Sequence, residues 1–159
     1  MGGGRRTAAV ARGDPVNAVA VPELHTERLL LRGWRGEDRA PFARLNADPR
    51  VAEFLSAPLD RPESDAFVDR IVRHWADDGF GIWAVERTED RSFLGFTGLS
   101  APAFEARFTP AIEVGWRFAP DAWGHGYASE AARAAVRFGF EALARSCRSP
   151  CRRTADLER

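Results

Sequence analysis

The chain has 159 residues, with 23 basic and 23 acidic side chains and a formal net charge of zero at neutral pH. This length allows one domain with a sizeable core, and the balanced charge gives no reason to expect binding to nucleic acid or to an anionic membrane. No apolar run is long enough to span a bilayer, and none follows the N-terminal arginines as in a secretory signal, so we expect a soluble cytoplasmic protein.

The N-terminal half predicts a leader, a strand and two helices. Residues 1–22 contain mainly glycine, alanine, arginine and proline without periodicity, which predicts a disordered leader. Residues 24–32 predict a single strand that ends at Gly33. Residues 37–46 begin with acidic side chains, as helices often do, and residues 62–77 repeat apolar side chains at helical spacing, so each segment predicts a helix.

The second half predicts three strands and a further helix. Residues 80–87 and 93–100 flank a polar loop and predict a β-hairpin. Residues 111–118 predict the next strand after a connector at 102–108, and residues 126–143 carry one polar and one apolar stripe along a helix. Segments in this order predict a single α/β domain.

A glycine loop between the last predicted strand and the last predicted helix is the most informative stretch. It runs through Trp123, Gly124, His125, Gly126, Tyr127 and Ala128. Glycines let the backbone approach a ligand, and the first amides of a helix are free donors at the positive end of its dipole. The loop therefore predicts a bound pyrophosphate, and the molecule that carries the pyrophosphate decides the function.

Three classes of phosphate-binding loop compete for this segment. The dinucleotide fingerprint requires glycine or alanine at position 129, which is a serine here. The nucleoside-triphosphate loop requires a lysine, and the chain contains none. The third class is the coenzyme A loop of acetyltransferases, which the segment matches more closely.

The stretch from Trp123 to Ala131 resembles the coenzyme A loop of the GNAT superfamily of N-acetyltransferases, whose pattern is Gln/Arg-x-x-Gly-x-Gly/Ala. Trp123 stands where Gln or Arg is usual. This departure is similar to the branch that acetylates the N-termini of ribosomal proteins, in which Trp-Gly-x-Gly-Tyr-Ala-Ser/Thr-Glu-Ala is common. Residues 26–32 and 112–116 also resemble that branch. The resemblance covers residues 24–144 and implies a mixed, largely antiparallel sheet flanked by helices.

The resemblance also implies an activity, which is transfer of acetyl from acetyl-CoA to a primary amine by direct attack, without an acyl-enzyme. The implied acceptor is a protein N-terminus, with small amines or antibiotics next. Two other classes stay open. One is a degenerate, non-catalytic module that holds coenzyme A, or nothing, and acts through its exposed sheet edge. The other is a different nucleotide-binding enzyme, which the missing lysine and the missing third loop glycine disfavour.

Acetyl transfer requires a group that accepts the proton of the amine. Glu113 is the only acid within the strand predicted over residues 111–118. One interpretation of Glu113 is a general base that acts through water, and the other is a solvated strand acid or an ion-pair partner. The apolar residues that alternate with Glu113 are expected on the opposite face of the strand, and they are Ile112, Val114, Trp116 and Phe118.

The residues implied to bind coenzyme A surround the glycine loop. A pyrophosphate cradle that acts mainly through backbone N–H groups is expected at Gly124, His125, Gly126, Tyr127 and Ala128. For the side chain of His125, a phosphate donor and a solvent-facing group are both open, and Tyr127 faces either the acyl chain or the core.

Two aromatic residues flank the cradle. Trp123 is expected to pack under the loop. Phe118 is implied to bond the pantetheine amides through its backbone, the alternative being a core aromatic residue. The remaining indole rings in the domain predict core positions rather than cofactor contacts, and they belong to Trp34, Trp75, Trp83 and Trp116.

Residues 145–159 depart from the family pattern. The resemblance implies a further strand, an Asn-containing loop, a helix and two closing strands, from which the group that protonates the leaving thiolate usually comes. Codons for residues 145–159 can be chosen so that another reading frame encodes such a strand and loop, so we expect a frameshifted, unstructured tail behind an incomplete domain of residues 23–144. Cys147 and Cys151 lack the ligand number and the nearby histidine of a zinc site, and no metal is expected.

Overall fold

The computed structural model describes residues 20–55, 58–101 and 111–146. The elements in chain order are β1 (Leu24–His25), β2 (Leu29–Arg32), α1 (Arg39–Ala47), α2 (Pro49–Ala52), α3 (Arg61–Asp78), β3 (Ile82–Arg87), β4 (Phe93–Ser100), β5 (Glu113–Phe118) and α4 (Tyr127–Ser146). Most of the predicted leader, the connector at 102–108 and the tail from residue 147 with both cysteines lie outside the described residues.

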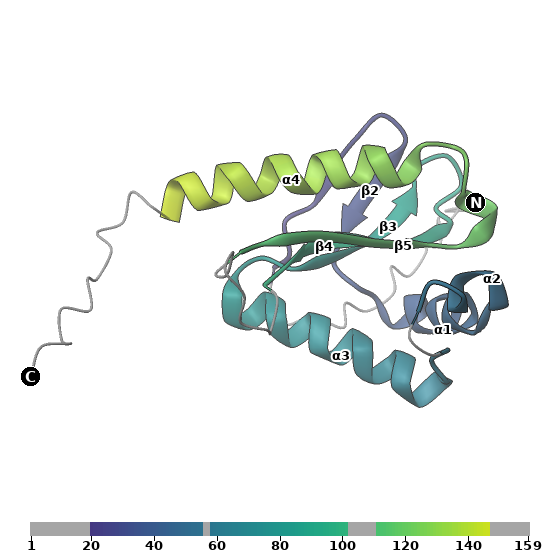
Figure 1. Cartoon of the computed structure of the whole chain (residues 1–159). Helices are drawn as coiled ribbons and strands as arrows, with labels where there is room; N and C mark the ends of the chain where they lie inside the picture. Colours follow the sequence, from purple (N-terminus) through teal and green to yellow (C-terminus); the bar gives the residue numbers. More distant parts are fainter. Residues whose placement is uncertain (1–19, 56–57, 102–110, 147–159) are drawn as a thin grey trace, which may run out of the picture.

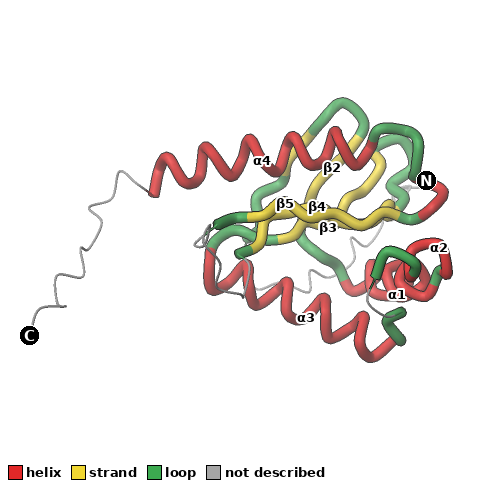
Figure 2. Tube along the Cα trace, viewed as in Figure 1, coloured by secondary structure: helices red, strands yellow, loops and turns green. Residues whose placement is uncertain are grey.

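The described strands form one antiparallel sheet in the order β1-β2-β3-β4-β5. Helix α4 covers one face of this sheet, and α1, α2 and α3 lie on the other face (Figure 1). The tube view shows the same three layers, with the strands between the two groups of helices (Figure 2). The predicted α/β class with a largely antiparallel sheet and flanking helices is confirmed. Of the described helices, none combines the length and apolarity needed to cross a bilayer.

The single strand predicted over residues 24–32 is instead a tight hairpin of β1 and β2. Thr26 causes the break, because its hydroxyl accepts a hydrogen bond from the Leu29 amide at 3.0 Å and competes with the extended ladder. The helix predicted from residue 37 begins two residues later, after a 3₁₀ turn over Gly36–Asp38. The β3–β4 hairpin and the long helix α3 agree with the predictions.

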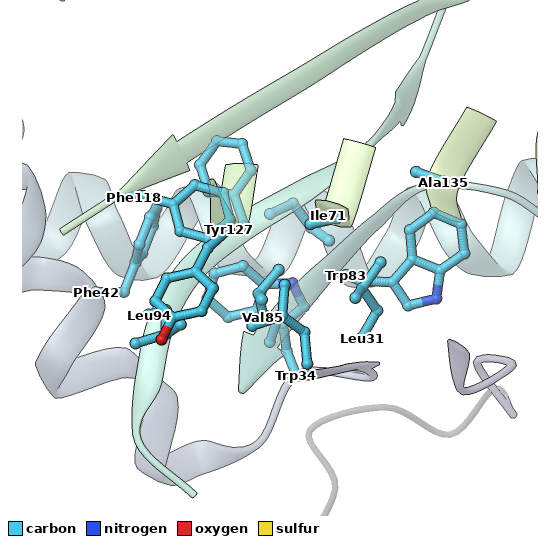
Figure 3. Close-up of a cluster of buried hydrophobic side chains, with 14 of the residues drawn as sticks. Leu31, Trp34, Phe42, Ile71, Trp83, Val85, Leu94, Phe118, Tyr127 and Ala135 are labelled. Atoms are coloured by element: carbon cyan, nitrogen blue, oxygen red, sulfur yellow. The ribbon is translucent and has the colours of Figure 1, made fainter. Parts of the chain in front are cut away.

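An aromatic core lies between the sheet and its helices. Figure 3 shows Phe42, Trp83, Phe118, Tyr127 and other members of this buried cluster. The predicted core positions of Trp34, Trp75 and Trp83 are confirmed. The predicted core position of Trp116 is wrong, because its ring is 54% exposed. Trp116 lies on β5, the last strand of the described sheet, where the side chain has a neighbouring strand on one side only.

A buried ion network fixes the start of α1 against the sheet. The Arg32 guanidinium on β2 donates to Glu86 on β3 at 2.6 Å and to Asp38 at 2.7 and 2.9 Å. Burial lowers the pKa of Arg32, but the hydrogen bonds and charges of the two carboxylates outweigh it and raise that pKa overall. Because all three side chains are almost fully buried, the network ties the start of α1 to the central strands.

Candidate active site at the end of β5

The glycine loop lies where β5 ends and α4 begins. Gly124 and Gly126 adopt φ angles of +78° and +79°, a backbone conformation that residues other than glycine rarely adopt. A Cβ atom added at Gly124 would meet nothing within 4 Å, so the backbone of the loop faces open space. The first amides of the 20-residue helix α4 follow directly. This is the geometry that holds a phosphate group at a helix N-terminus.

The aromatic residues of the loop have three different surroundings. Trp123 Nε1 donates to the Phe118 carbonyl at 2.8 Å, which ties the loop to the end of β5, and its ring is 42% exposed. The His125 side chain is exposed and stacks on the Tyr127 ring with centroids 5.5 Å apart. Tyr127 itself belongs to the buried core beside Leu94 and Phe118 (Figure 3). Trp123 and Tyr127 thus fix the loop to β5 and to the core, while Gly124 and Gly126 stay exposed.

A clamp of Arg28 and Glu130 holds the loop from the β1–β2 hairpin. Arg28 Nε donates to Glu130 Oε2 at 2.8 Å, and Arg28 Nη1 donates to the His125 carbonyl at 3.0 Å. Glu130 Oε1 also accepts from the Thr26 hydroxyl at 2.6 Å and from the Arg28 amide at 3.0 Å. The Arg28 guanidinium lies 4.7 Å from the centroid of the Tyr127 ring. One carboxylate therefore joins the hairpin to the first turn of α4.

The clamp predicts a pH-dependent contribution to folding. Burial raises the pKa of Glu130, but hydrogen bonds from Thr26 and Arg28 outweigh it and lower the pKa below the ordinary value of 4.5. A depressed folded-state pKa stabilises the fold above the unfolded value, and this stabilisation is lost as pH falls through the folded value. Glu130→Gln should thus unfold at lower urea concentration than the wild type at pH 7, and the difference should shrink progressively below about pH 4.5.

Glu141→Gln is the matched control, since Glu141 is an exposed acid on the same helix. Urea titrations between pH 7 and 3.5 measure the midpoints of all three proteins. The Glu130 clamp would be contradicted by a midpoint difference that stays constant across this range, or by equal losses in both variants.

Glu113 begins β5, at the end of the strand remote from the glycine loop. Its exposed carboxylate accepts a hydrogen bond from the Ser100 hydroxyl at 3.0 Å. The β4–β5 register pairs Glu113 with Ser100 and Arg117 with Phe96, so Glu113 and Arg117 share the face of the sheet that α1 and α3 cover. As predicted, the apolar residues that alternate with Glu113 lie on the other face.

The outer edge of β5 presents backbone groups beside the loop. The Ala119 amide donates to the Leu94 carbonyl at 2.9 Å, and the Gly115 carbonyl accepts from the Thr97 hydroxyl at 3.1 Å, so both groups point toward β4. Backbone groups alternate along a strand, and those of Trp116 and Phe118 therefore point away from β4. The Phe118 carbonyl accepts from Trp123 Nε1, but in the described part of the sheet no strand lies beyond β5 to pair with the Phe118 amide or the Trp116 groups.

A cavity of about 380 Å³ lies between β5, the loop and the end of α2. Its lining is mostly aromatic and aliphatic and consists of Val51, Phe54, Leu55, Trp116, Arg117, Phe118 and Trp123. Phe54 and Trp123 meet edge to face across it, with ring centroids 6.2 Å apart. Phe118 and Trp123, two of the residues predicted from the sequence, thus border the same hollow, whereas Glu113 is not part of its lining.

The model of the acetyltransferase (GNAT) domain family matches residues 28–154, which is most of the chain. The chain belongs to this family. The Bacillus subtilis protein YkkB is 34% identical over 122 residues, which are 76% of this chain and 70% of that protein. The Aspergillus fumigatus FsC-acetyl coenzyme A-N(2)-transacetylase is 34% identical over 134 residues, 78% of this chain and 55% of the fungal protein. The chain therefore spans about half of that relative.

A solved structure supports the same family assignment. The acetyltransferase from Agrobacterium tumefaciens is 28% identical, with a TM-score of 0.67 over 83% of this chain and 74% of its own. GNAT acetyltransferases use acetyl-CoA as co-substrate, and the open glycine loop at the start of α4 fits its pyrophosphate. Among the described residues, no three histidine, cysteine or acidic side chains gather as a metal site would require.

The sequence did not indicate several residues that shape this candidate site. Arg28 and Glu130 are 102 positions apart, and no local pattern indicates that they meet. No local pattern indicates that Phe54 and Leu55, which follow α2, line the same cavity as residues of β5. Arg117 carried a usable signal, because it lies four positions after Glu113 on one strand and must therefore share its face.

Proposed function

We propose that this chain transfers acetyl from acetyl-CoA to the amine of a protein N-terminus. The observation that carries the proposal is the open glycine loop at the N-terminus of α4, beside a cavity bounded by β5. The loop would bind the pyrophosphate through backbone N–H groups from Gly124 to Ala128. The Phe118 carbonyl already accepts from Trp123 Nε1, so the outward backbone N–H of Phe118 would donate to the pantetheine, which leads the thioester toward the cavity.

In the proposed reaction the amine nitrogen attacks the thioester carbonyl directly. The amine first loses a proton, for which Glu113 is the proposed acceptor through water. The new N–C bond forms, the C–S bond breaks, and the thiolate of coenzyme A leaves and takes up, through water, the second proton that the nitrogen loses. No acyl-enzyme is needed, since the acceptor cavity and the coenzyme loop meet at the same end of β5.

Two features bear on the acceptor. The exposed rings of Phe54, Trp116 and Trp123 around the cavity offer apolar surface that the first residues of a peptide can cover. A small amine is the second candidate, favoured by the limited volume of about 380 Å³ and by the relative whose name describes an N(2)-acetylation. The rival function, a module that holds coenzyme A without catalysis, predicts binding and no transfer.

The proposal is tested with the full chain. Coenzyme A should raise its thermal unfolding midpoint in a concentration-dependent manner, because a ligand that binds only the folded state stabilises it by mass action. Mass spectrometry should then detect acetylated peptides or amines after incubation with acetyl-CoA. Protection without transfer would support the non-catalytic module, and absence of both would refute the proposed function.

A further inference from the structure

Arg117 is the one charged side chain among the described residues that line the cavity. The other lining residues are aliphatic or aromatic, so Arg117 is the one residue of this lining whose side chain can offer a charge to a ligand. We infer that the acceptor amine carries a carboxylate close to the amino group, and that Arg117 binds this carboxylate. The inference rests on the proposed acetyl transfer and adds the chemical class of the acceptor.

Arg117 is held in place by neutral partners. Its Nη1 donates to Asn46 Oδ1 at 2.6 Å, and Asn46 Nδ2 in turn donates to the Ser64 hydroxyl at 2.9 Å. Asn46 and Ser64 are fully buried. The guanidinium carbon also lies 5.4 Å from the centroid of the Phe96 ring. These contacts orient the guanidinium without neutralising it, which is how a preorganised anion site is built.

The charge of Arg117 is not balanced by a carboxylate in the part of the chain that the structure describes. Burial alone lowers the pKa of Arg117. By contrast, the pKa of Arg28 and that of Arg50 are raised by a carboxylate that each contacts. A half-buried guanidinium without an anionic partner is costly, and a ligand carboxylate would remove this cost while forming two parallel hydrogen bonds with the fork.

The position of Arg117 relative to the coenzyme site determines where the amine would lie. Arg117 directly precedes Phe118, whose outward backbone N–H is the proposed partner of pantetheine. A carboxylate on Arg117 would therefore hold a nearby amine beside the thioester. Glu113 lies on the same face, about 13 Å further along the strand at 3.2–3.4 Å per residue. One bridging water does not span this distance, so proton transfer to Glu113 would require a chain of several waters.

Two sources can supply such a carboxylate. One is the α-carboxylate of a free amino acid, and the other is an acidic side chain next to the N-terminus of a peptide. Both present the same chemistry to the guanidinium. The aromatic lining favours an acceptor with an apolar body in either case.

Acetylated products are suitable probes, because they lack an amine whose pKa would differ between matched compounds. The first pair is N-acetyl-L-phenylalanine and N-acetyl-L-phenylalaninamide. The second pair is the acetylated peptide amide Ser-Asp-Phe and its Ser-Asn-Phe counterpart. Calorimetric titration of the full chain, with and without saturating coenzyme A, gives the dissociation constant of each probe. The carboxylate member of at least one pair should bind about 10- to 100-fold more tightly.

Variants connect this preference to the guanidinium. Arg117→Gln should bring the two members of the pair to near-equal affinity, and Arg117→Lys should keep part of the preference, because it retains charge but not the planar fork. Asn46→Asp places an internal carboxylate beside Arg117 and should also reduce the preference. Arg70→Gln is the control, since Arg70 is exposed, stacks on Phe67 and does not line the cavity. Protection by coenzyme A should be unchanged throughout.

Equal binding within both pairs, or an unchanged preference in Arg117→Gln, would overturn the inference. A joint loss of coenzyme A protection and probe preference in both Arg117 variants would overturn it too, since the guanidinium would then contact the coenzyme. If Arg117→Gln does not fold, Arg117→Lys and Asn46→Asp decide. If coenzyme A does not protect the wild-type chain against thermal unfolding, the proposed function is contradicted. Titration of the probes without coenzyme A still tests the role of Arg117.

Discussion

Glu113→Gln should slow acetyl transfer by about 10²- to 10⁴-fold at neutral pH, the usual contribution of a general base. Glutamine keeps the shape of the side chain and its capacity to accept from the Ser100 hydroxyl, but it cannot take up the amine proton. The Michaelis constant for acetyl-CoA should change little, because Glu113 lies at the end of β5 remote from the glycine loop. Initial rates of coenzyme A release at several acceptor concentrations measure both quantities.

The pH profile separates a base from a structural role. As pH rises, a growing fraction of the amine is already unprotonated, so the deficit of Glu113→Gln should shrink. Glu141→Gln, which removes an exposed acid from α4, should behave as wild type at every pH. A variant at position 113 with the wild-type rate at neutral pH would return Glu113 to the role of a solvated strand acid.

Gly126→Val should abolish the protection that coenzyme A gives against thermal unfolding. Gly126 has a φ angle of +79°, and a branched side chain there would be strained and would occupy the space that the pyrophosphate needs. At a ligand concentration 100 times the dissociation constant, the wild type should gain about 2.7 kcal/mol, which the variant should lack. Thermal unfolding with increasing coenzyme A measures the difference.

Gly79→Val is the matched control for backbone strain. Gly79 ends α3 with a φ angle of +72°, and a Cβ atom there would meet nothing within 4 Å. Both variants should therefore lose intrinsic stability of order 1–3 kcal/mol. Gly79→Val alone should keep the response to coenzyme A. Undiminished protection in Gly126→Val would exclude the loop as the pyrophosphate cradle.

The elements that local chemistry specifies were predictable from the sequence. The β3–β4 hairpin follows from alternating segments around a polar loop, and α3 follows from its helical spacing together with the glycine at its end. The glycine loop was equally predictable, because a strand, two glycines and a helix start are consecutive in the chain. The tight β1–β2 hairpin was missed, since a single threonine hydroxyl interrupts an otherwise regular strand pattern.

The surroundings of the site were decided only by the tertiary structure. Arg28 and Glu130 form the clamp across 102 positions, and Arg117 and Asn46 meet across 71. Trp116 is apolar and was expected in the core, but its place on the last strand of the described sheet leaves it half exposed at the cavity. Sequence alone determined the family and the glycine loop, because these depend on neighbours along the chain. The clamp, the cavity and its unbalanced guanidinium depend on which distant surfaces the fold brings together.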